Sequence, residues 1–491
     1  MNSKCQIFTP ISYVNQMLDA IDYKGANVLG KYVLENSCGE GNILIEIVKR
    51  YIEAAQNFNY STQEIKEDLG KYILGFEIDQ RVREVCIKKL NNEIERYGIK
   101  NVKWQIENKD YLKCKINKEI EFVVGNPPYI MYQDLNLNDR IFLRENFLSC
   151  SIGKFDYCYA FIEKSIKDLS VTGRMVYLVP NSIFKNVFGK ELRKVIKNSL
   201  EKIFDYKERA VFEKALTSPA IICLNNKIKV DTINYFDVDN HEVHLINKEN
   251  LGDKWLFSYN ESNENSITSK KFGDYFRVSN SVATLLNSVY IINKEDIEEE
   301  KEHFIKIKDF TIEKDVLRPA ASPRSYSLQR EEYIIFPYTY KDGCLKRFEE
   351  EEFKLKYPGA YKYLFNYASQ LNQRKSDKSA KWFEYGRSQA LSHINQEKIL
   401  ISSVITNEVK SYRIDKNTIP YSGFYIIPIN GKSLDEAEEI LRSEKFLSYL
   451  SIRGINAHGK SLRFSVYDIL NYPINNTNLE KGSTSNNIDE E

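Results

Sequence analysis

The chain has 491 residues, of which 42% are hydrophobic and 28% are charged, and its formal net charge is +1 at pH 7. This length is enough for roughly two to four domains that each have a core. The balanced charge excludes a uniformly basic protein, so a polyanionic partner would have to bind at local patches. No leader peptide and no apolar run of membrane-spanning length is recognisable, which favours a cytoplasmic protein without a membrane partner.

The cysteines are scattered along the chain without C-x-x-C spacing. This pattern is not typical of a zinc site or of a disulfide framework, so we expect free thiols and no required metal ion. The eight positions are Cys5, Cys38, Cys86, Cys114, Cys150, Cys158, Cys223 and Cys344.

Short apolar runs alternate with amphipathic stretches in the first half of the chain. The strand-like runs are 33–34, 73–76, 122–124, 175–179 and 220–224, and the clearest helical patterns are 42–51 and 159–169. Such alternation predicts an α/β fold, with a mixed, mostly parallel sheet covered by helices.

The alternation is lost from about residue 240, where polar loops, isolated strands such as 333–336 and aromatic-rich segments follow. We therefore predict a first domain over 1–240 and an α+β domain over 241–478. The polar composition of 479–491 is typical of a disordered tail.

The segment VLENSCGEGNIL, residues 33–44, joins a strand pattern to a helix pattern through Glu35, Gly39 and Gly41. Glycines at such a turn let the backbone approach a ligand, and the helix N-terminus offers free N–H groups. A tight structural turn is the alternative. The dinucleotide fingerprint is incomplete because Leu44 stands where its third glycine would be.

Two further acidic residues, Glu77 and Asp110, lie close to the ends of strand-like segments. Glu77 ends the strand-like segment ILGFEID, where a carboxylate can bind ribose hydroxyls. Asp110, in ENKDYL, precedes the strand that ends at Asn126.

The tetrapeptide Asn-Pro-Pro-Tyr, residues 126–129, follows a buried strand. The prolines cannot continue the strand, so they predict a stiff loop in the crevice where open α/β sheets bind ligands. Taken alone, the tetrapeptide is better explained by a proline turn without function.

Together these motifs resemble those of S-adenosylmethionine-dependent N6-adenine DNA methyltransferases of the γ class, represented by the Taq enzyme. In this family the cofactor motifs come first and the target-recognition domain last. The resemblance covers the first half by specific motifs and the second half only by size and character. IFTP at 7–10, GKFDYCYAFIEKSI at 153–166 and AVFEKALTSPAIICL at 210–224 resemble further family motifs, while Asn36 stands where proline is usual.

The resemblance implies two groups of site residues. The catalytic residues are Asn126, Pro127, Pro128 and Tyr129, and Tyr129 and Phe212 are the rings that stack on the target base. The residues implied to bind S-adenosylmethionine are Thr9, Glu35, Cys38, Gly39, Gly41, Glu77, Ile78, Asp110, Tyr111 and Asn126.

Chemistry explains why the tetrapeptide suits adenine. The lone pair of the amino nitrogen is delocalised into the ring, and two acceptors, the Asn126 side-chain oxygen and the Pro127 carbonyl, would favour a pyramidal nitrogen. The adenine has to leave the duplex stack to reach them, and aromatic rings offset that cost. Phe212 could instead be a core residue, in which case Tyr132 is the next candidate.

A basic and aromatic segment of the second half is the predicted DNA contact. Its cationic residues are Arg374, Lys375, Lys378, Lys381 and Arg387, interleaved with Trp382, Phe383 and Tyr385. Arg318, Arg324, Arg330, Lys460 and Arg463 lie in further basic segments, and a solvated surface is the alternative for each. The run Lys185, Lys190, Arg193, Lys194 and Lys197 is interpreted as an exposed helix face.

We therefore predict a site-specific adenine methyltransferase that acts on double-stranded DNA as a monomer, in restriction-modification, phage defence or epigenetic marking. A separate cognate restriction endonuclease is compatible with this prediction, whereas a fused nuclease is not expected. The alternatives are a methyltransferase for RNA or protein glutamine, and a non-catalytic DNA-binding module.

Overall fold

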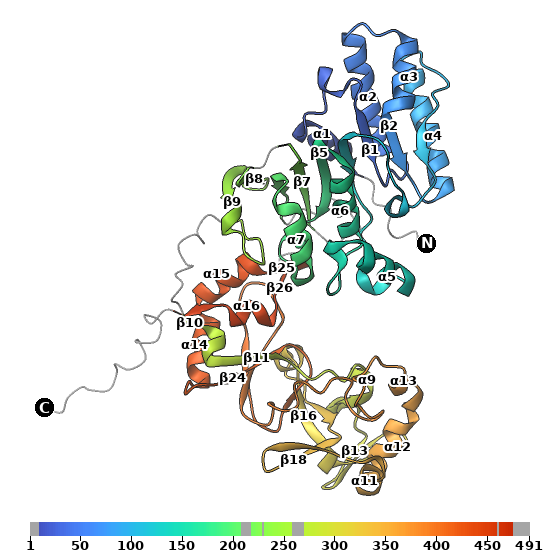
Figure 1. The fold of residues 1–491 in the computed structure, drawn as a ribbon. Coiled ribbons are helices and arrows are strands. Elements are labelled where there is room, and N and C mark those ends of the chain that lie inside the picture. Colours follow the sequence, from blue (N-terminus) through green and yellow to red (C-terminus); the bar gives the residue numbers. More distant parts are fainter. Residues whose placement is uncertain (1–8, 208–217, 228–229, 258–269, 459–460, 475–491) are drawn as a thin grey trace, which may run out of the picture. The chain divides into compact units, whose positions relative to one another are not determined.

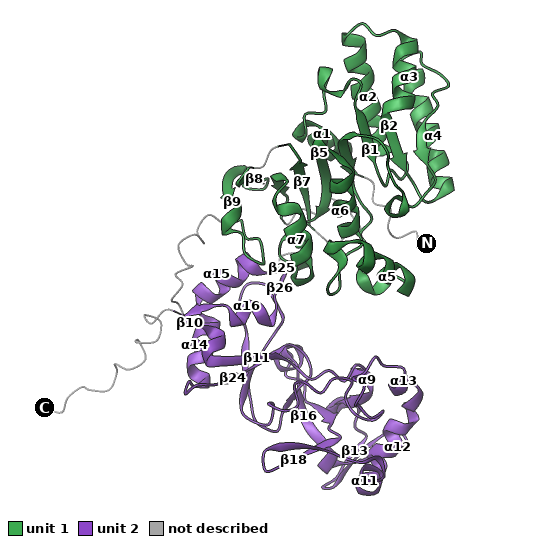
Figure 2. Cartoon of the chain, viewed as in Figure 1, with its two compact units in different colours: residues 1–262, 455–460 green, residues 263–454, 461–491 purple. Residues whose placement is uncertain are grey.

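The computed structural model describes residues 9–207, 218–227, 230–257, 270–458 and 461–474. The chain forms two compact units, one of residues 1–262 with 455–460 and the other of residues 263–454 with 461–491 (Figure 2). The first unit contains the predicted parallel sheet.

A nine-stranded sheet organises the first unit, in the order β3-β2-β1-β4-β5-β7-β6-β8-β9 (Figure 1). Strands β3, β2, β1, β4 and β5 are parallel, whereas β7 runs antiparallel to both of its neighbours. The strands are β1 Tyr32–Glu35, β2 Ile73–Phe76, β3 Gln105–Glu107, β4 Ile120–Gly125, β5 Leu169–Pro180, β6 Leu200–Asp205, β7 Pro219–Asn225, β8 Thr232–Asp237 and β9 Glu242–Asn247.

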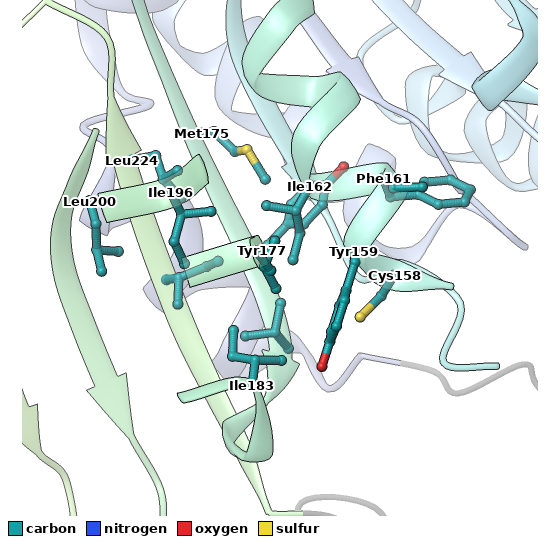
Figure 3. Close-up of a cluster of buried hydrophobic side chains, with 14 of the residues drawn as sticks. Cys158, Tyr159, Phe161, Ile162, Met175, Tyr177, Ile183, Ile196, Leu200 and Leu224 are labelled. Atoms are coloured by element: carbon teal, nitrogen blue, oxygen red, sulfur yellow. The ribbon is translucent and has the colours of Figure 1, made fainter. Parts of the chain in front are cut away.

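Helices cover both faces of this sheet. The helices of one face are α1 Ile11–Ala20, α2 Asn42–Asn57, α3 Thr62–Tyr72 and α4 Gln80–Glu95, and those of the other face are α5 Leu137–Asn146, α6 Cys158–Asp168 and α7 Lys190–Lys197. Alternate strand residues serve the two cores, since Val33 packs with the first group and Leu34 with the second. Figure 3 shows the second core, where Ile162 of α6 lies over Met175 and Tyr177 of β5. The predicted α/β fold is confirmed.

Capping residues mark the starts of helices α3 and α4. Ser61 and Glu64 form a capping box at the start of α3, and the Asp79 side chain accepts the N–H groups of Arg81 and Val82 at the start of α4. Such caps satisfy backbone donors that a helix leaves free. Because β1, β2, β4 and β5 are parallel, their carboxyl ends meet at one edge of the sheet.

The sheet of the first unit continues past residue 240. Strands β8 and β9 pair from Thr232 with Asn247 to Asp237 with Glu242, so this hairpin still belongs to the first sheet. The division into a catalytic and a target-recognition domain stays a prediction.

The second unit combines several small sheets with short helices, as the predicted α+β character requires. Its main sheets have the orders β11-β24-β20-β22 and β12-β17-β16-β23. The predicted strand at 333–336 is β17, Glu332–Ile335. The strands of these two sheets are β11 Phe276–Asn280, β12 Ile291–Asn293, β16 Leu317–Ala321, β17, β20 Lys398–Ile401, β22 Ser411–Ile414, β23 Ile419–Pro420 and β24 Phe424–Pro428.

The remaining elements of the second half are short. The strands are β10 Lys270–Lys271, β13 Glu299–Glu300, β14 Phe304–Ile307, β15 Phe310–Glu313, β18 Tyr338–Lys341, β19 Cys344–Arg347, β21 Val404–Ile405, β25 Ile455–His458, β26 Ser461–Arg463 and β27 Pro473–Ile474. The helices are α8 Phe272–Tyr275, α9 Asn287–Tyr290, α10 Pro323–Ser327, α11 Glu350–Lys356, α12 Pro358–Asn366, α13 Ala368–Asn372, α14 Leu434–Arg442, α15 Glu444–Arg453 and α16 Val466–Leu470.

The interpretation of α7 as a uniformly exposed basic face is wrong for Arg193. This side chain is buried and donates hydrogen bonds to the carbonyls of Ile183, Asn186 and Asp253. Burial lowers the pKa of Arg193 to about 10. Arg193 therefore connects α7 both to the segment before it, through Ile183 and Asn186, and to Asp253, which follows β9.

Two further features agree with the sequence. Cys38, Cys86, Cys114, Cys150, Cys158, Cys223 and Cys344 are free thiols, while Cys5 and the predicted tail at 479–491 lie outside the described residues. Among the described helices, none combines the length and the apolar character that a membrane span needs.

Candidate active site

Glu35 ends β1 with its carboxyl group buried at the sheet edge. Its side chain is 2% exposed, and Oε2 is a buried acceptor without a hydrogen-bond partner. Burial raises the pKa of Glu35 well above its usual range. A buried acceptor left unsatisfied is costly, so this oxygen is suited to a ligand that donates a hydrogen bond and carries positive charge.

The turn after Glu35 requires its glycines. Gly39 and Gly41 have φ values of +51° and +88°, which side chains rarely adopt, and a Cβ at Gly41 would lie 2.6 Å from the Sγ atom of Cys86. Helix α2 begins directly after Gly41 without a side-chain cap. The turn thus presents bare backbone next to a helix N-terminus, as the sequence predicts.

Glu77, at the end of β2, holds this turn in place. Its Oε2 accepts the N–H of Gly39 at 3.0 Å and its Oε1 accepts the N–H of Asp79 at 2.8 Å. Burial raises the pKa of Glu77. Each carboxylate oxygen has further acceptor capacity for a ligand hydroxyl. The neighbouring Ile78 side chain is 46% exposed and offers an apolar surface beside it.

The structure places Cys38 and Tyr111 in the cores, so a ligand at the edge would meet only the backbone of Cys38. The Cys38 thiol packs against Cys86. The hydrogen bond between these two thiols, together with burial, raises the pKa of Cys38 well above the usual value. Tyr111 is 2% exposed, and its hydroxyl donates to Asp168 at 2.7 Å. Their roles in cofactor binding stay predictions.

Asp110 is half-buried at the start of a short helical turn. Its Oδ1 accepts the N–H of Leu112 at 3.1 Å, and its Oδ2 lies 3.2 Å from the Nζ atom of Lys113. The carboxylate is thereby oriented by two neighbours, and its predicted contact with the cofactor is not tested.

Asn126 follows β4 and has its amide oriented from both ends. The Nδ2 group donates to Thr9 Oγ1 at 3.1 Å, and Oδ1 accepts from the Tyr129 hydroxyl at 2.6 Å. Thr9 is buried, and the Asn126 side chain is half-buried. A donor and an acceptor on opposite ends fix which end of the amide is the oxygen.

The Tyr129 hydroxyl has a second acceptor, the Leu178 carbonyl of β5 at 2.8 Å. Its ring is half-buried against the core, and burial raises the pKa of Tyr129 well above the usual value. Pro127 is buried and Pro128 half-buried between the two polar residues. The tetrapeptide is therefore a fixed loop at the carboxyl end of β4.

The segment after the tetrapeptide is fastened by Asp156. This residue forms an isolated antiparallel bridge with Met131, and its carboxylate accepts the backbone N–H groups of Cys158, at 3.0 Å, and Ile130. Burial raises the pKa of Asp156 to about 6. The motif GKFDY contains this residue, but the sequence did not indicate its contact with the loop.

The second stacking ring is not located. Phe212 lies outside the described residues. Tyr132, the next candidate, packs edge-on to Phe155 at 5.2 Å between ring centroids. The guanidinium groups of Arg140 and Arg144 lie 4.6 and 5.3 Å from its ring centroid.

Sequence reasoning missed a polar network below the sheet edge. The Asn36 amide donates to Ser165 Oγ at 2.7 Å and to the Tyr177 hydroxyl, while its Oδ1 is buried without a partner. Ser165 also meets the Tyr111 hydroxyl at 3.2 Å. The asparagine in the usual proline position was the one signal for it.

In the second unit, the predicted DNA contacts divide into two kinds. Arg374 donates to the carbonyls of Thr284, Trp382 and Glu384, so it stabilises the fold of its segment. Lys381 and Arg387 have ion-pair partners in Glu349 and Asp377, whereas Lys375 and Lys378 are exposed. DNA binding by these five residues stays a prediction.

Known proteins share this combination of motifs and fold. Residues 41–212 match the model described as "Eco57I restriction-modification methylase". The match includes Gly41, Glu77 and the tetrapeptide 126–129. The matched residues lie within the first unit.

Curated relatives of the methylase region agree with this. The chain is 26% identical over 391 residues to the "Type II restriction enzyme and methyltransferase RM.Eco57I" of Escherichia coli, covering 69% of this chain and 38% of that protein. It is 27% identical over 235 residues to the "Type II methyltransferase M.BstVI" of Geobacillus stearothermophilus, covering 45% and 42%. The chain thus spans about two fifths of the length of these relatives.

A solved structure shares the fold over most of the chain. The type IIL restriction-modification enzyme MmeI, solved in complex with DNA, aligns with a TM-score of 0.61 at 13% identity. The alignment covers 94% of this chain and 66% of that one. It supports the fold.

The cofactor of this methylase region is S-adenosylmethionine, as the motifs predict. The residues fit it, because Glu35 has an unsatisfied buried oxygen for a cationic donor and the glycine turn keeps side chains away from the backbone. Glu77 and Ile78 offer a carboxylate and an apolar surface for a nucleoside at the next strand end.

Proposed function

We propose that this protein is a site-specific DNA methyltransferase that methylates the N6 amino group of adenine in double-stranded DNA. The observation that carries the proposal is the Asn126 amide, whose oxygen end is fixed by Thr9 and Tyr129 at the carboxyl end of β4. An acceptor fixed in advance is what a planar amino group requires from its catalyst.

S-adenosylmethionine supplies an electrophilic methyl group on a sulfonium when it is bound. Asn126 Oδ1 and the Pro127 carbonyl each accept one N–H of the target amino group, which favours a pyramidal nitrogen with its lone pair directed outward. The proton that leaves the nitrogen after methyl transfer passes to solvent. Holding the acceptor groups in position beforehand lowers the barrier without any nucleophilic side chain.

The target adenine must leave the duplex for this geometry to form, at a cost of about a few kcal/mol. The Tyr129 ring stacks on the extruded base in this proposal, and Phe212 is the second ring. The hydroxyl of Tyr129 remains bonded to Asn126 and thus connects base capture with amide orientation.

A methyltransferase for RNA or for a glutamine side chain is the second candidate, because these substrates also present a planar amino group. The names of the relatives favour DNA, since they are type II restriction or modification enzymes. We further propose a monomeric cytoplasmic enzyme of a restriction-modification, phage defence or epigenetic system, with residues 241–478 as the target-recognition domain. A separate endonuclease need not bind it, and no metal ion takes part.

Methyl transfer from radiolabelled S-adenosylmethionine to DNA, RNA and protein tests this proposal directly. We expect label only in DNA, at N6-methyladenine after digestion to nucleosides, and none with Asn126→Ala. Label at cytosine, in RNA or in protein would contradict it. Unlabelled DNA together with failure to bind S-adenosylmethionine would favour the non-catalytic DNA-binding module.

A further inference from the structure

A hollow of about 610 Å³ lies within the second unit, away from the predicted DNA contacts at 374–387. Helix α10 forms one wall, and residues 402–412, which include β21, form the other. The lining side chains that matter here are Arg324, Ser327, Asn407, Glu408, Lys410 and Tyr412.

The lining offers hydrogen-bond donors and acceptors side by side. Arg324 can only donate, Glu408 can only accept, and the Asn407 amide can do both. All three side chains are exposed. Within the described residues, neither the Arg324 guanidinium nor the Asn407 amide has a hydrogen-bond or ion-pair partner. Their polar groups are available to a ligand.

This availability distinguishes Arg324 and Asn407 from the arginines of the basic segment that the sequence favours. Arg374 donates its hydrogen bonds to carbonyls of its own unit, and Arg387 pairs with Asp377 at 2.9 Å. Binding DNA through them would require breaking those contacts. Arg324 and Asn407 require no such exchange.

We propose that Arg324 and Asn407, which are exposed at this hollow, reach base-pair edges in a groove of duplex DNA and set the recognition sequence. Arginine pairs with guanine through O6 and N7, and asparagine pairs with adenine through N6 and N7. The inference rests on the proposed DNA methyltransferase function, which it extends from the chemistry to the choice of site.

The charged residues of the lining are two cations, Arg324 and Lys410, and one carboxylate, Glu408. Glu408 lies 3.3 Å from Lys410 and reduces the local positive charge, so it would repel a phosphate group. Its carboxylate can instead accept a hydrogen bond from the amino group of cytosine. The exposed Arg463, on the strand that pairs with Val404, is placed next to the hollow for a backbone contact.

The test compares the DNA sequences methylated by the wild type with those methylated by Arg324→Ala and Asn407→Ala. Sequencing of modified bases in host genomic DNA gives the recognition sequence of each protein. Single-turnover methylation of short duplexes then measures discrimination between that sequence and its single-base-pair variants. We expect each substitution to reduce discrimination at one position by roughly 5- to 150-fold, and to leave other positions unchanged.

Lys362→Ala is the matched control, since it removes an exposed cation from α12 in the same unit. It should keep the wild-type recognition sequence. Thermal unfolding and S-adenosylmethionine affinity show that each variant is folded. Unchanged discrimination in both Arg324→Ala and Asn407→Ala would overturn this inference while leaving the proposed function intact. A wild type that methylates no DNA would instead overturn the proposed function, and this inference with it.

Discussion

At the scale of single residues, the decisive feature is the pair of bonds that orients Asn126. Rotating the amide by half a turn would place its NH2 group against the Tyr129 hydroxyl and its oxygen against Thr9 Oγ1. The Tyr129 hydroxyl has one proton and two acceptors within reach, Asn126 Oδ1 and the Leu178 carbonyl. In the structure Oδ1 lies on the Tyr129 side of the amide and Nδ2 on the Thr9 side.

The first prediction concerns the acceptor itself. Asn126→Ala removes one of the two acceptors for the amino group, so it should raise the barrier to methyl transfer by about 2.7 to 4 kcal/mol, by analogy with the loss of one preorganised hydrogen-bond partner elsewhere. Single-turnover methylation measures the effect. DNA affinity should stay at the wild-type level, and a normal transfer rate would contradict the assigned role.

The second prediction separates the ring of Tyr129 from its hydroxyl. Tyr129→Phe retains the stacking surface but removes the hydrogen bond to Asn126 Oδ1. It should therefore raise the barrier to methyl transfer by about 0.5 to 1.5 kcal/mol. Tyr129→Ala should also weaken the hold on the extruded base, by about 1 to 3 kcal/mol. The fluorescence of 2-aminopurine at the target position, which rises on unstacking, reports the difference. A phenylalanine variant with wild-type rate would show that Thr9 alone orients the amide.

At the scale of elements, the ends of β1 and β2 form one structure through Glu77. The Glu77 carboxylate accepts hydrogen bonds from Gly39, in the glycine turn after β1, and from Asp79, in the loop after β2. A ligand bound there therefore contacts a turn whose conformation is already fixed. The sequence indicated Glu77 and the glycines separately. It could not show that they touch, because they are 38 residues apart and on different strands.

The third prediction tests this connection. Glu77→Ala and Asp110→Ala should each weaken S-adenosylmethionine binding by about 1.5 to 3 kcal/mol, the range for hydrogen bonds to charged groups. Calorimetric titration measures the affinity, and DNA binding without cofactor serves as the control. Unaltered cofactor affinity in both variants would remove the assignment.

The fourth prediction concerns the element that follows the tetrapeptide. The pKa of Asp156 is raised from 3.8 to about 6 by burial, so the folded state holds this proton more tightly than the unfolded chain. The stabilisation from this group is complete below about pH 4 and is lost as the pH rises through about 6. Asp156→Asn should remove this contribution to the pH dependence of the free energy of unfolding.

Urea unfolding of both proteins between about pH 4.5 and 7 checks the sign. The free energy of unfolding of the wild type, minus that of Asp156→Asn, should decrease as the pH rises. A difference that stays constant would show that Asp156 titrates near its ordinary value, and one that increases would show that folding lowers its pKa.

At the scale of the whole molecule, the sequence predicted the first unit far better than the second. Apolar runs that are buried on both sides, such as 73–76 and 122–124, identified the central strands. The strands at the sheet margins were missed because they are short, as in β3, or alternate in burial, as in β8. The small sheets of the second unit pair residues that are distant in sequence, and no local pattern encodes such pairing.

The candidate site shows the same limit. The motif residues Asn126, Glu35 and Glu77 lie at strand ends as predicted, because a parallel sheet brings those ends to one edge. Contacts that depend on side-chain direction, such as that of Asn36 with Ser165, could not be predicted, because the asparagine in the proline position marked a departure from the motif without indicating its partner.

The fifth prediction concerns the surface cations of the second unit. Lys375 and Lys378 are exposed, so neutralising both should flatten the salt dependence of DNA binding by about one unit of slope per lost phosphate contact. Arg374→Ala should instead lower the unfolding temperature, because three carbonyls lose their donor. Fluorescence anisotropy at several salt concentrations measures the first effect, and an unchanged slope would identify these lysines as solvated surface.

Strand β1 sends Val33 and Leu34 into opposite cores and ends in Glu35, whose Oε2 atom has no hydrogen-bond partner. A small molecule that satisfies Glu35 is therefore thermodynamically linked to the melting of both layers of the first unit. A ligand that binds only the folded chain adds about 2.7 kcal/mol of stability at one hundred times its dissociation constant. Occupancy of the site can thus be read as a rise in melting temperature, without following any reaction.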